Sequence, residues 1–122
     1  MAYKLTWQIP RKALRLSLSG EYTIANAKEV NQQISEMLDE NNSAAALLID
    51  ATAMKPSYGF DQIRASQKYM DHPKMKLILV ASKEKLVTLS LMIIFNSGRA
   101  SFQHFDDVEK ASKALQGRVL NL

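Results

Sequence analysis

The chain has no cysteine among its 122 residues. This excludes a disulfide framework, a thiolate metal site and a cysteine nucleophile, and it suits a reducing cytoplasm, which we take as the expected compartment. Histidine is almost as scarce. His72 and His104 lack the HxH and HExxH spacings, and a zinc site needs three or four converging ligands. We therefore expect no metal and no other cofactor.

Glycine is also rare, and its scarcity bears on phosphate binding. The four glycines stand apart from one another and form neither a P-loop nor a G-x-G-x-x-G turn. There is no G-x-S-x-G elbow, and nothing in the sequence pairs a serine with a histidine. We therefore predict no catalytic residues and a non-enzymatic protein.

Clusters of one charge are missing as well. The formal net charge is +4, but the sixteen lysines and arginines are scattered, and the longest basic run is Arg11 and Lys12. Surfaces that bind nucleic acid usually cluster their positive charge and interleave it with aromatic side chains. We expect a solvated basic surface and no nucleic-acid partner.

The apolar residues follow two periods that together predict one α/β domain over residues 1–122. Alternation over residues 3–9 and 13–19 predicts an antiparallel hairpin. Runs that are apolar on both faces predict buried parallel strands at 45–50 and 76–81, and a short strand is expected at 102–105. With one helix between successive later strands, the order is β-β-α-β-α-β-α-β-α, a mostly parallel five-stranded sheet.

Helix starts are marked by capping residues. Thr23 or Asn26 is expected to begin the first helix, with Glu29 completing a capping box after Asn26. The second helix is expected over residues 58–69, burying Phe60, Ile63 and Met70. The third and fourth helices are predicted to begin at two further caps, which are Ser82 (with Glu84 in the first turn) and Asp106 (with Glu109).

Four stretches resemble the STAS family, the SpoIIAA-like domains of bacterial anti-sigma-factor antagonists and anion-transporter tails. They are residues 3–8 (YKLTWQ), 20–23 (GEYT), 47–51 (LLIDA) and 101–108 (SFQHFDDV). The resemblance covers nearly the whole chain and is closest to small stand-alone proteins labelled STAS/SEC14-like. It implies a SpoIIAA-like fold and a regulatory protein that binds a protein partner.

In antagonists of this family, an Asp-Ser-Ser-Gly motif opens the helix after the central strand, and phosphorylation there switches partner binding. The matching stretch begins with Pro56 in place of the aspartate. Ser57 matches the first serine, Tyr58 occupies the usual phosphosite, and Gly59 matches the glycine. Ser57, the one serine of the motif that this stretch keeps, is therefore the candidate phosphorylation site.

Ligands of open α/β sheets gather beyond the carboxyl ends of the strands. The residues expected at that edge are Asp50, Ser57, Tyr58, Gly59, Ser82 and Lys83. Two of them have a structural alternative: Asp50 either binds a ligand or accepts hydrogen bonds from the turn that follows it. Ser57 either is modified or caps a helix.

Residues 86–95 (LVTLSLMIIF) are apolar on nearly every side of the expected helix, which is too short to span a bilayer. Three interpretations remain open: burial within the domain, packing against a second subunit, or lining a site for an apolar molecule or a membrane surface. The candidates for an interface are Leu89, Met92, Ile93 and Phe95.

The sequence thus leads to two hypotheses. The first is a cytoplasmic, homodimeric interaction module that binds a protein partner through the loop and helix after the central strand. The alternative is a carrier or sensor of a small apolar molecule or lipid, which rests on the apolar helix and on the SEC14-like side of the resemblance.

Overall fold

The computed structural model describes residues 3–56, 58–96 and 99–122. Within these residues, five strands and four α-helices follow one another in the predicted order, with two short 3-10 helices added. The elements are β1 (Tyr3–Ile9), β2 (Ala13–Gly20), α1 (Ile24–Glu40), β3 (Ala45–Met54), α2 (Phe60–Ala65), η1 (Lys68–Asp71), β4 (Met75–Ala81), α3 (Lys85–Phe95), β5 (Ser101–Phe105), α4 (Val108–Arg118) and η2 (Val119–Asn121).

The strands form one sheet in the order β1-β2-β3-β4-β5. β1 pairs with β2 antiparallel, and the remaining neighbours pair parallel. This confirms the predicted hairpin and the mostly parallel five-stranded sheet. The strand order follows the chain order because each parallel connection moves one strand along the sheet.

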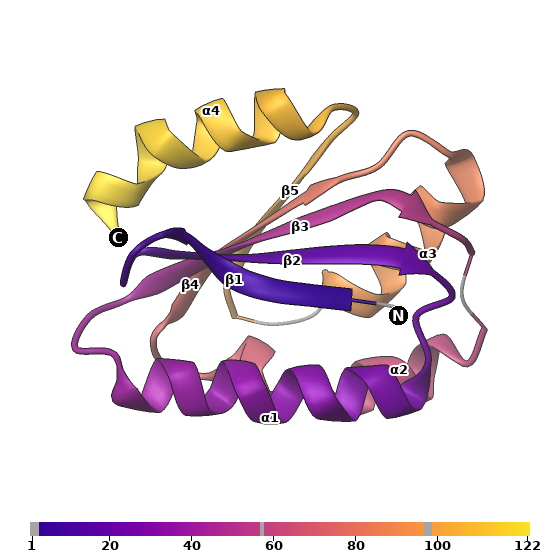
Figure 1. Ribbon diagram of the computed structural model, residues 1–122, viewed down its shortest axis with the longest axis horizontal. Coiled ribbons are helices and arrows are strands. Elements are labelled where there is room, and N and C mark those ends of the chain that lie inside the picture. The colour runs from indigo at the N-terminus through magenta and orange to yellow at the C-terminus, as the bar shows by residue number, and fades with distance from the viewer. Residues whose placement is uncertain (1–2, 57, 97–98) are drawn as a thin grey trace.

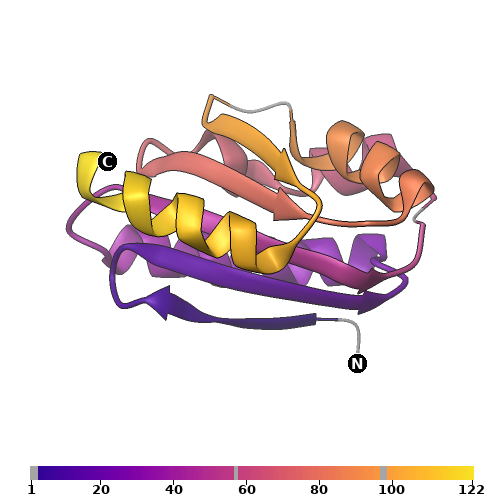
Figure 2. The same cartoon turned by 90° about the horizontal axis from the view of Figure 1, so that it is seen from above.

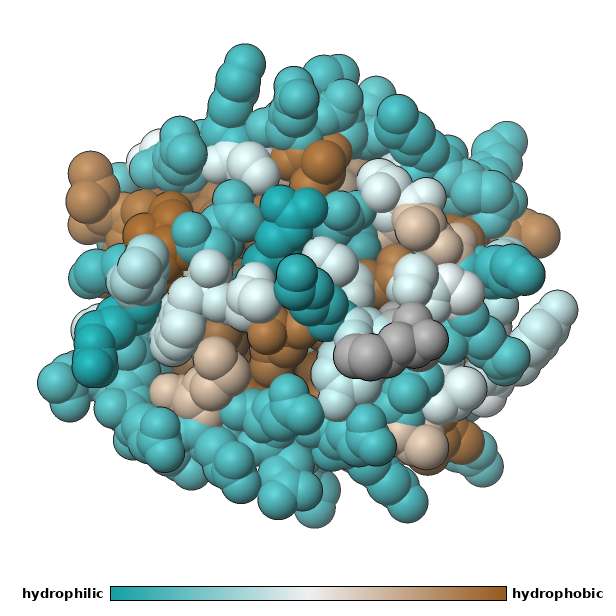
Figure 3. Space-filling view, viewed as in Figure 1, coloured by the Kyte–Doolittle hydropathy of each residue, from teal (hydrophilic) through white to brown (hydrophobic). Residues whose placement is uncertain are grey.

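The two faces of the sheet are covered unequally. α1, α2 and α3 lie on one face, and α4 lies alone on the other (Figures 1 and 2). The larger core, which includes Leu16, Ile49 and Val80, lies on the three-helix face, and a smaller core around Leu48 and Leu79 lies under α4. Hydrophilic residues cover the outward surfaces of α4 and α1, and hydrophobic residues appear in the band between them (Figure 3).

β3 is central because it is apolar on both faces, as predicted, but it is longer than predicted. It extends to Met54 rather than ending at Asp50. The parallel pairing with β2 continues past Asp50, where Ser19 lies opposite Ala53 and Gly20 opposite Met54. Main-chain hydrogen bonds therefore keep this segment extended, although Thr52 and Ala53 are exposed to solvent.

The second helix is shorter than predicted, since α2 ends at Ala65 and is followed by η1. The Ser66 hydroxyl donates back to the Gln62 carbonyl, and Gln67 leaves helical geometry with φ −101° and ψ 64°. The Gln67 side chain is buried and hydrogen-bonded inside the fold. A buried polar contact therefore interrupts the helix at Gln67.

Of the predicted helix caps, Thr23 is confirmed and the others are wrong. At α1 the capping box is formed by Thr23 and Asn26, not by Asn26 and Glu29. α3 is capped by Glu84, whose carboxylate accepts the N–H groups of residues 86 and 87, so Ser82 is not the cap. α4 is capped by Asp107 rather than by Asp106. The caps of α3 and α4 lie three and two residues beyond the ends of β4 and β5, so the first polar residue after each strand is not the cap.

Asp107 makes a pH-dependent contribution to stability. Its Oδ1 accepts hydrogen bonds from the N–H groups of Glu109 (2.6 Å) and Lys110 (3.3 Å). These bonds lower the pKa of Asp107, and the nearby Lys83 and Lys110 charges add to the effect. A carboxyl whose pKa is lowered by folding stabilises the fold fully above its unfolded value of about 4 and loses that contribution as the pH falls further.

Asp107→Ala is therefore expected to lower the melting temperature at pH 7, and the difference from wild type should shrink below about pH 4. Thermal melts across that range measure this. Asp106→Ala is the matched control, because Asp106 only pairs with Lys110 on the surface at 3.2 Å. An equal loss of melting temperature in both variants would contradict the assignment of the cap.

Candidate functional site

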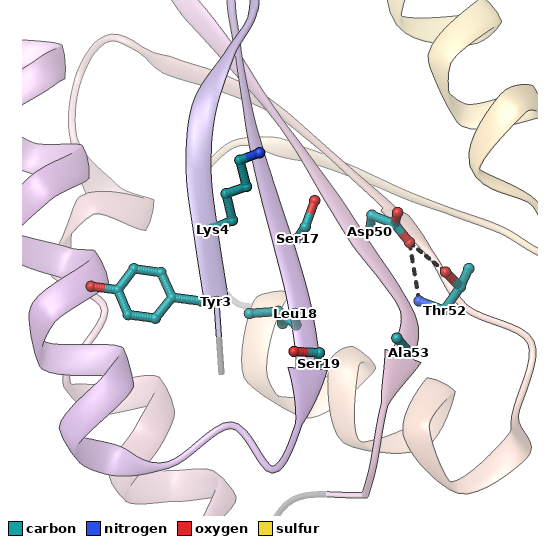
Figure 4. Close-up of a pocket in the computed structure, with 8 residues that line it drawn as sticks. All are labelled: Tyr3, Lys4, Ser17, Leu18, Ser19, Asp50, Thr52 and Ala53. Carbon is teal, nitrogen blue, oxygen red and sulfur yellow. Dashed lines mark hydrogen bonds between the residues drawn. The ribbon is translucent and has the colours of Figure 1, made fainter. Parts of the chain in front are cut away.

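Of the six predicted site residues, the five that the structure describes do not form a single site. Asp50 points from β3 toward the face that carries α4, where it borders a hollow on the uncovered part of the sheet (Figure 4). Ser82 is buried against α3 on the opposite face. Tyr58 and Gly59 lie at the start of α2. Asp50 and Ser82 thus lie at the same carboxyl edge of the sheet but on opposite faces of it.

The hollow beside Asp50 has a volume of about 500 Å³ and is open to one side. It exists because α4 covers only part of its face (Figure 2) and because β2 places two small serines, Ser17 and Ser19, beside Asp50. It is lined by Tyr3, Lys4, Ser17, Leu18, Ser19, Asp50, Thr52 and Ala53 (Figure 4).

Asp50 itself is engaged within the chain. Its Oδ2 forms an ion pair with Arg15 at 2.9 Å, and its Oδ1 accepts hydrogen bonds from the Thr52 N–H (3.1 Å) and hydroxyl (2.7 Å). These bonds from Thr52 match the structural alternative for Asp50, in which its carboxylate accepts hydrogen bonds from the turn that follows it. The carboxylate thus links β2 to β3 and shapes the floor of the hollow.

Ser82 and His104 form a pair that the sequence analysis missed. Residues 80 and 104 lie side by side in the parallel pairing of β4 with β5, which brings the two side chains together. The Ser82 Oγ lies 2.8 Å from His104 Nε2 and 2.6 Å from Thr88 Oγ1. Predicting this pair from the sequence would have required knowing the register of β4 with β5.

The direction of these hydrogen bonds argues against a nucleophilic serine. The Thr88 hydroxyl donates to the Glu84 carbonyl, so it must accept from the Ser82 hydroxyl. Ser82 Oγ then accepts from His104 Nε2–H, and the same N–H faces the Ser82 carbonyl at 3.2 Å. A general base would need its lone pair at that nitrogen. Ser82 is also only 1% exposed, so the pair has a structural role.

Lys83 extends into solvent next to this buried pair, and its charge helps to lower the pKa of Asp107. His72, the other histidine, lies 2.8 Å from Asp39 through its Nε2. Within the described ranges, no group of three or more His, Asp or Glu side chains could hold a metal ion.

The start of α2 lies against α3. Gly59 is the N-cap of α2 and has a left-handed φ of 72°, which favours glycine. A hollow of about 350 Å³ is lined by residues 59–62 and by Ile93 of α3. Tyr58 is 78% exposed beside it. The predicted role of Ser57 falls outside the described residues.

α3 presents an apolar stripe to solvent. At about 100° per residue, its exposed apolar residues fall in an arc of roughly 120°. They are Leu86 (59% exposed), Leu89 (58%), Met92 (41%) and Ile93 (41%). We call these four residues the α3 stripe. Because Ile93 also lines the hollow at the start of α2, the stripe and that helix start form one continuous surface.

Phe95 was wrongly predicted to be exposed at an interface. It is 1% exposed and stacks on Tyr22, with ring centroids 6.2 Å apart. Leu86, which the prediction left out, is the most exposed member of the stripe. The error arose because a helix that is apolar on every side has no polar face to indicate its orientation.

A buried hydrogen-bond bridge holds α2 and α3 in place. The Tyr22 hydroxyl donates to Gln67 Oε1 at 2.7 Å, and Gln67 Nε2 donates to the Ile94 carbonyl at 3.3 Å. Gln67 thereby joins the end of α2 to the last turn of α3. Sequence alone gave no signal for this bridge, because glutamine is ordinarily a surface residue.

None of the helices in the described part of the chain has the length and apolar character needed to cross a membrane.

The fold has solved counterparts. An uncharacterized protein of the DUF3478 family with a SpoIIAA-like fold, from Shewanella loihica PV-4, matches with a TM-score of 0.65 and 15% identity, over 93% of this chain and 92% of that one. An anti-sigma factor antagonist from Mycobacterium paratuberculosis matches with a TM-score of 0.59 and 16% identity, over 94% and 95%. No protein-family model matches the chain, and no curated protein matches it in sequence. The chain thus has the SpoIIAA-like fold that its resemblance to the STAS family implies.

Proposed function

We propose that this chain is a non-enzymatic regulatory module that binds a protein partner across the α3 stripe and the start of α2. The observation that carries the proposal is the exposure of four large apolar side chains in one stripe on a folded domain. Contiguous apolar surface of this kind is typical of sites that bind proteins. The likeness of the fold to an anti-sigma factor antagonist agrees with a regulatory role.

The surrounding residues suit such a role. Tyr58 adds a large, nearly fully exposed aromatic ring beside Gly59, and aromatic side chains are enriched at the energetic centres of interfaces. The Gln67 bridge ties α2 to α3, so both parts of the surface are held at a defined relative position. A pre-organised surface loses less entropy when it binds.

The proposal predicts that Leu89→Glu weakens partner binding by about 30-fold or more, the effect of losing a central apolar contact worth about 2 kcal/mol. Partners captured from a lysate by the wild-type chain would be identified, purified and titrated against each variant by calorimetry. Gln116→Glu on α4 adds the same charge on a distant exposed surface and serves as control. Equal affinity of a purified partner for both variants would reject this surface.

The alternative of a small apolar molecule or lipid carrier is tested in the same preparations. A native mass spectrum of the purified chain reports its subunit count and any retained molecule. We expect the mass of the polypeptide alone, as one chain or two. A retained mass of a few hundred daltons that disappears in Leu89→Glu would favour the carrier instead.

The homodimer, the cytoplasmic location and the phosphorylation of Ser57 stay predictions. A second copy of the chain would occupy the α3 stripe, as the apolar run of residues 86–95 suggests. A reducing compartment agrees with the lack of cysteine.

A further inference from the structure

The α3 stripe has the spacing of a helix that packs against another helix. Its members recur at intervals of three, three and one along α3, so they form one row rather than a scattered surface. The opposite side of the helix is already occupied, because Val87, Leu91 and Ile94 are buried in the larger core. The row is therefore an additional face, available for a second helix.

The charges at the two ends of α3 indicate which helix fits. Lys85 begins α3 and is exposed within the same arc as the stripe. The last turn of α3 contains no basic residue, so its terminal carbonyls have no cation from within that turn. A cation is favourable at the C-terminal end of a helix. The N-terminal end of one α3 thus complements the C-terminal end of another.

We propose that two copies of this chain associate by packing their α3 stripes antiparallel about a two-fold axis at Leu89. In this arrangement Leu89 faces the Leu89 of the second copy, and Leu86 faces Met92. Lys85 lies at the C-terminal end of the opposite helix. A parallel arrangement would instead place the two Lys85 charges side by side, which is unfavourable. A two-fold axis also uses the same surface on both copies.

The size of the surface sets the strength of the dimer. Stable interfaces bury about 800 Å² on each partner. Four side chains that are 41–59% exposed provide less than this, even with the start of α2 added. We therefore expect a reversible dimer with a dissociation constant between about 10 μM and about 1 mM.

This inference rests on the proposed function in one respect, which is that the α3 stripe is a surface for binding protein. The dimer would cover that surface, so a partner and a second copy would compete for it. The dimer is nevertheless measured on the purified chain alone.

The absence of cysteine allows a direct test of the geometry, because each introduced thiol is the only one in the chain. Leu89→Cys is expected to form a cross-linked dimer with oxidised glutathione. Leu86→Cys and Met92→Cys should each cross-link poorly alone, since equivalent residues would be offset by about 9 Å along the helix axis. Disulfides need Cα atoms within about 7 Å. Mixing these two variants should give the cross-linked dimer.

Gln116→Cys on α4 is the control and should give only background cross-linking. Sedimentation equilibrium should show a dimer for wild type at high concentration and a monomer for Leu89→Glu, with unchanged far-UV circular dichroism. Leu86→Cys cross-linking strongly with itself but not with Met92→Cys would overturn the antiparallel arrangement. A wild-type chain that stays monomeric up to about 1 mM would overturn the dimer. If the chain were monomeric but Leu89→Glu still weakened its binding to a purified partner, the proposed function would stand without the dimer.

Discussion

Ile94→Glu is expected to unfold the chain, whereas Ile93→Glu leaves it folded. The two residues are neighbours in α3, but Ile94 is 0% exposed and Ile93 is 41% exposed. At position 94 a carboxylate would be buried among apolar side chains such as Val87 and Leu91. At position 93 the same carboxylate reaches water.

The energies explain why the outcomes diverge. Loss of a buried isoleucine side chain costs about 2–5 kcal/mol, and an unpaired buried charge adds several more. The total approaches the whole stability of a small domain, about 5–15 kcal/mol. Ile93→Glu loses only part of a half-exposed side chain, so we expect a change below about 1 kcal/mol.

Far-UV circular dichroism and urea titration measure both variants. Ile94→Val is the control for position 94, and it should unfold cooperatively with a loss of about 1 kcal/mol. If Ile94→Glu kept the wild-type urea midpoint, the orientation of α3 described above would be wrong. The same result would also remove the α3 stripe as a surface.

Two buried tyrosines are expected to respond in opposite directions when their hydroxyls are removed. Tyr22 donates to Gln67, so Tyr22→Phe leaves the Gln67 oxygen without that bond and should destabilise the fold by about 1–2 kcal/mol. The Tyr69 hydroxyl is buried with no hydrogen-bond partner in the described part of the chain. Tyr69→Phe should therefore stabilise the fold by up to about 1 kcal/mol.

Alkaline pH gives a second measurement. Burial raises the pKa of both tyrosines, and it is the largest cause of each shift. A group whose pKa is raised by folding contributes stability that is complete below its unfolded value, about 10 for tyrosine, and is lost as the pH rises toward the folded value. The double variant Tyr22→Phe/Tyr69→Phe should lose stability less steeply above pH 10 than wild type.

Urea titrations at pH 7 and between pH 9 and 11 measure both effects. Tyr58→Phe is the control, because Tyr58 is 78% exposed and should change neither value. If Tyr69→Phe destabilised the fold as much as Tyr22→Phe, the Tyr69 hydroxyl would have a partner, and the packing around it would need revision.

The strands and their succession along the chain followed from sequence because their signal is local. The period of two in β1 and β2, and the two-faced apolar runs of β3 and β4, each record how many faces of the strand are buried. Right-handed connections then left few ways to assemble the sheet. The buried side of α1 obeys the same local logic, since Ala27, Val30 and Ile34 form one stripe against polar neighbours.

The sites could not be predicted in this way, because they depend on contacts between distant segments. Ser82 meets His104 through the register of β4 with β5, and Gln67 meets Tyr22 and Ile94 through the packing of three elements. No period in the sequence records such a register. Asp50 and Ser82 share an edge of the sheet but face opposite sides of it.

Sequence by itself determined the α/β class, the five-stranded sheet and the presence of an unusually apolar helix. Only the tertiary structure decided that this helix buries Phe95 and exposes Leu86. The reason is physical: a helix that is apolar all round can turn any side inward at similar cost in transfer free energy. Its orientation is then set by close packing against the sheet and α2, which exists only once the chain has folded.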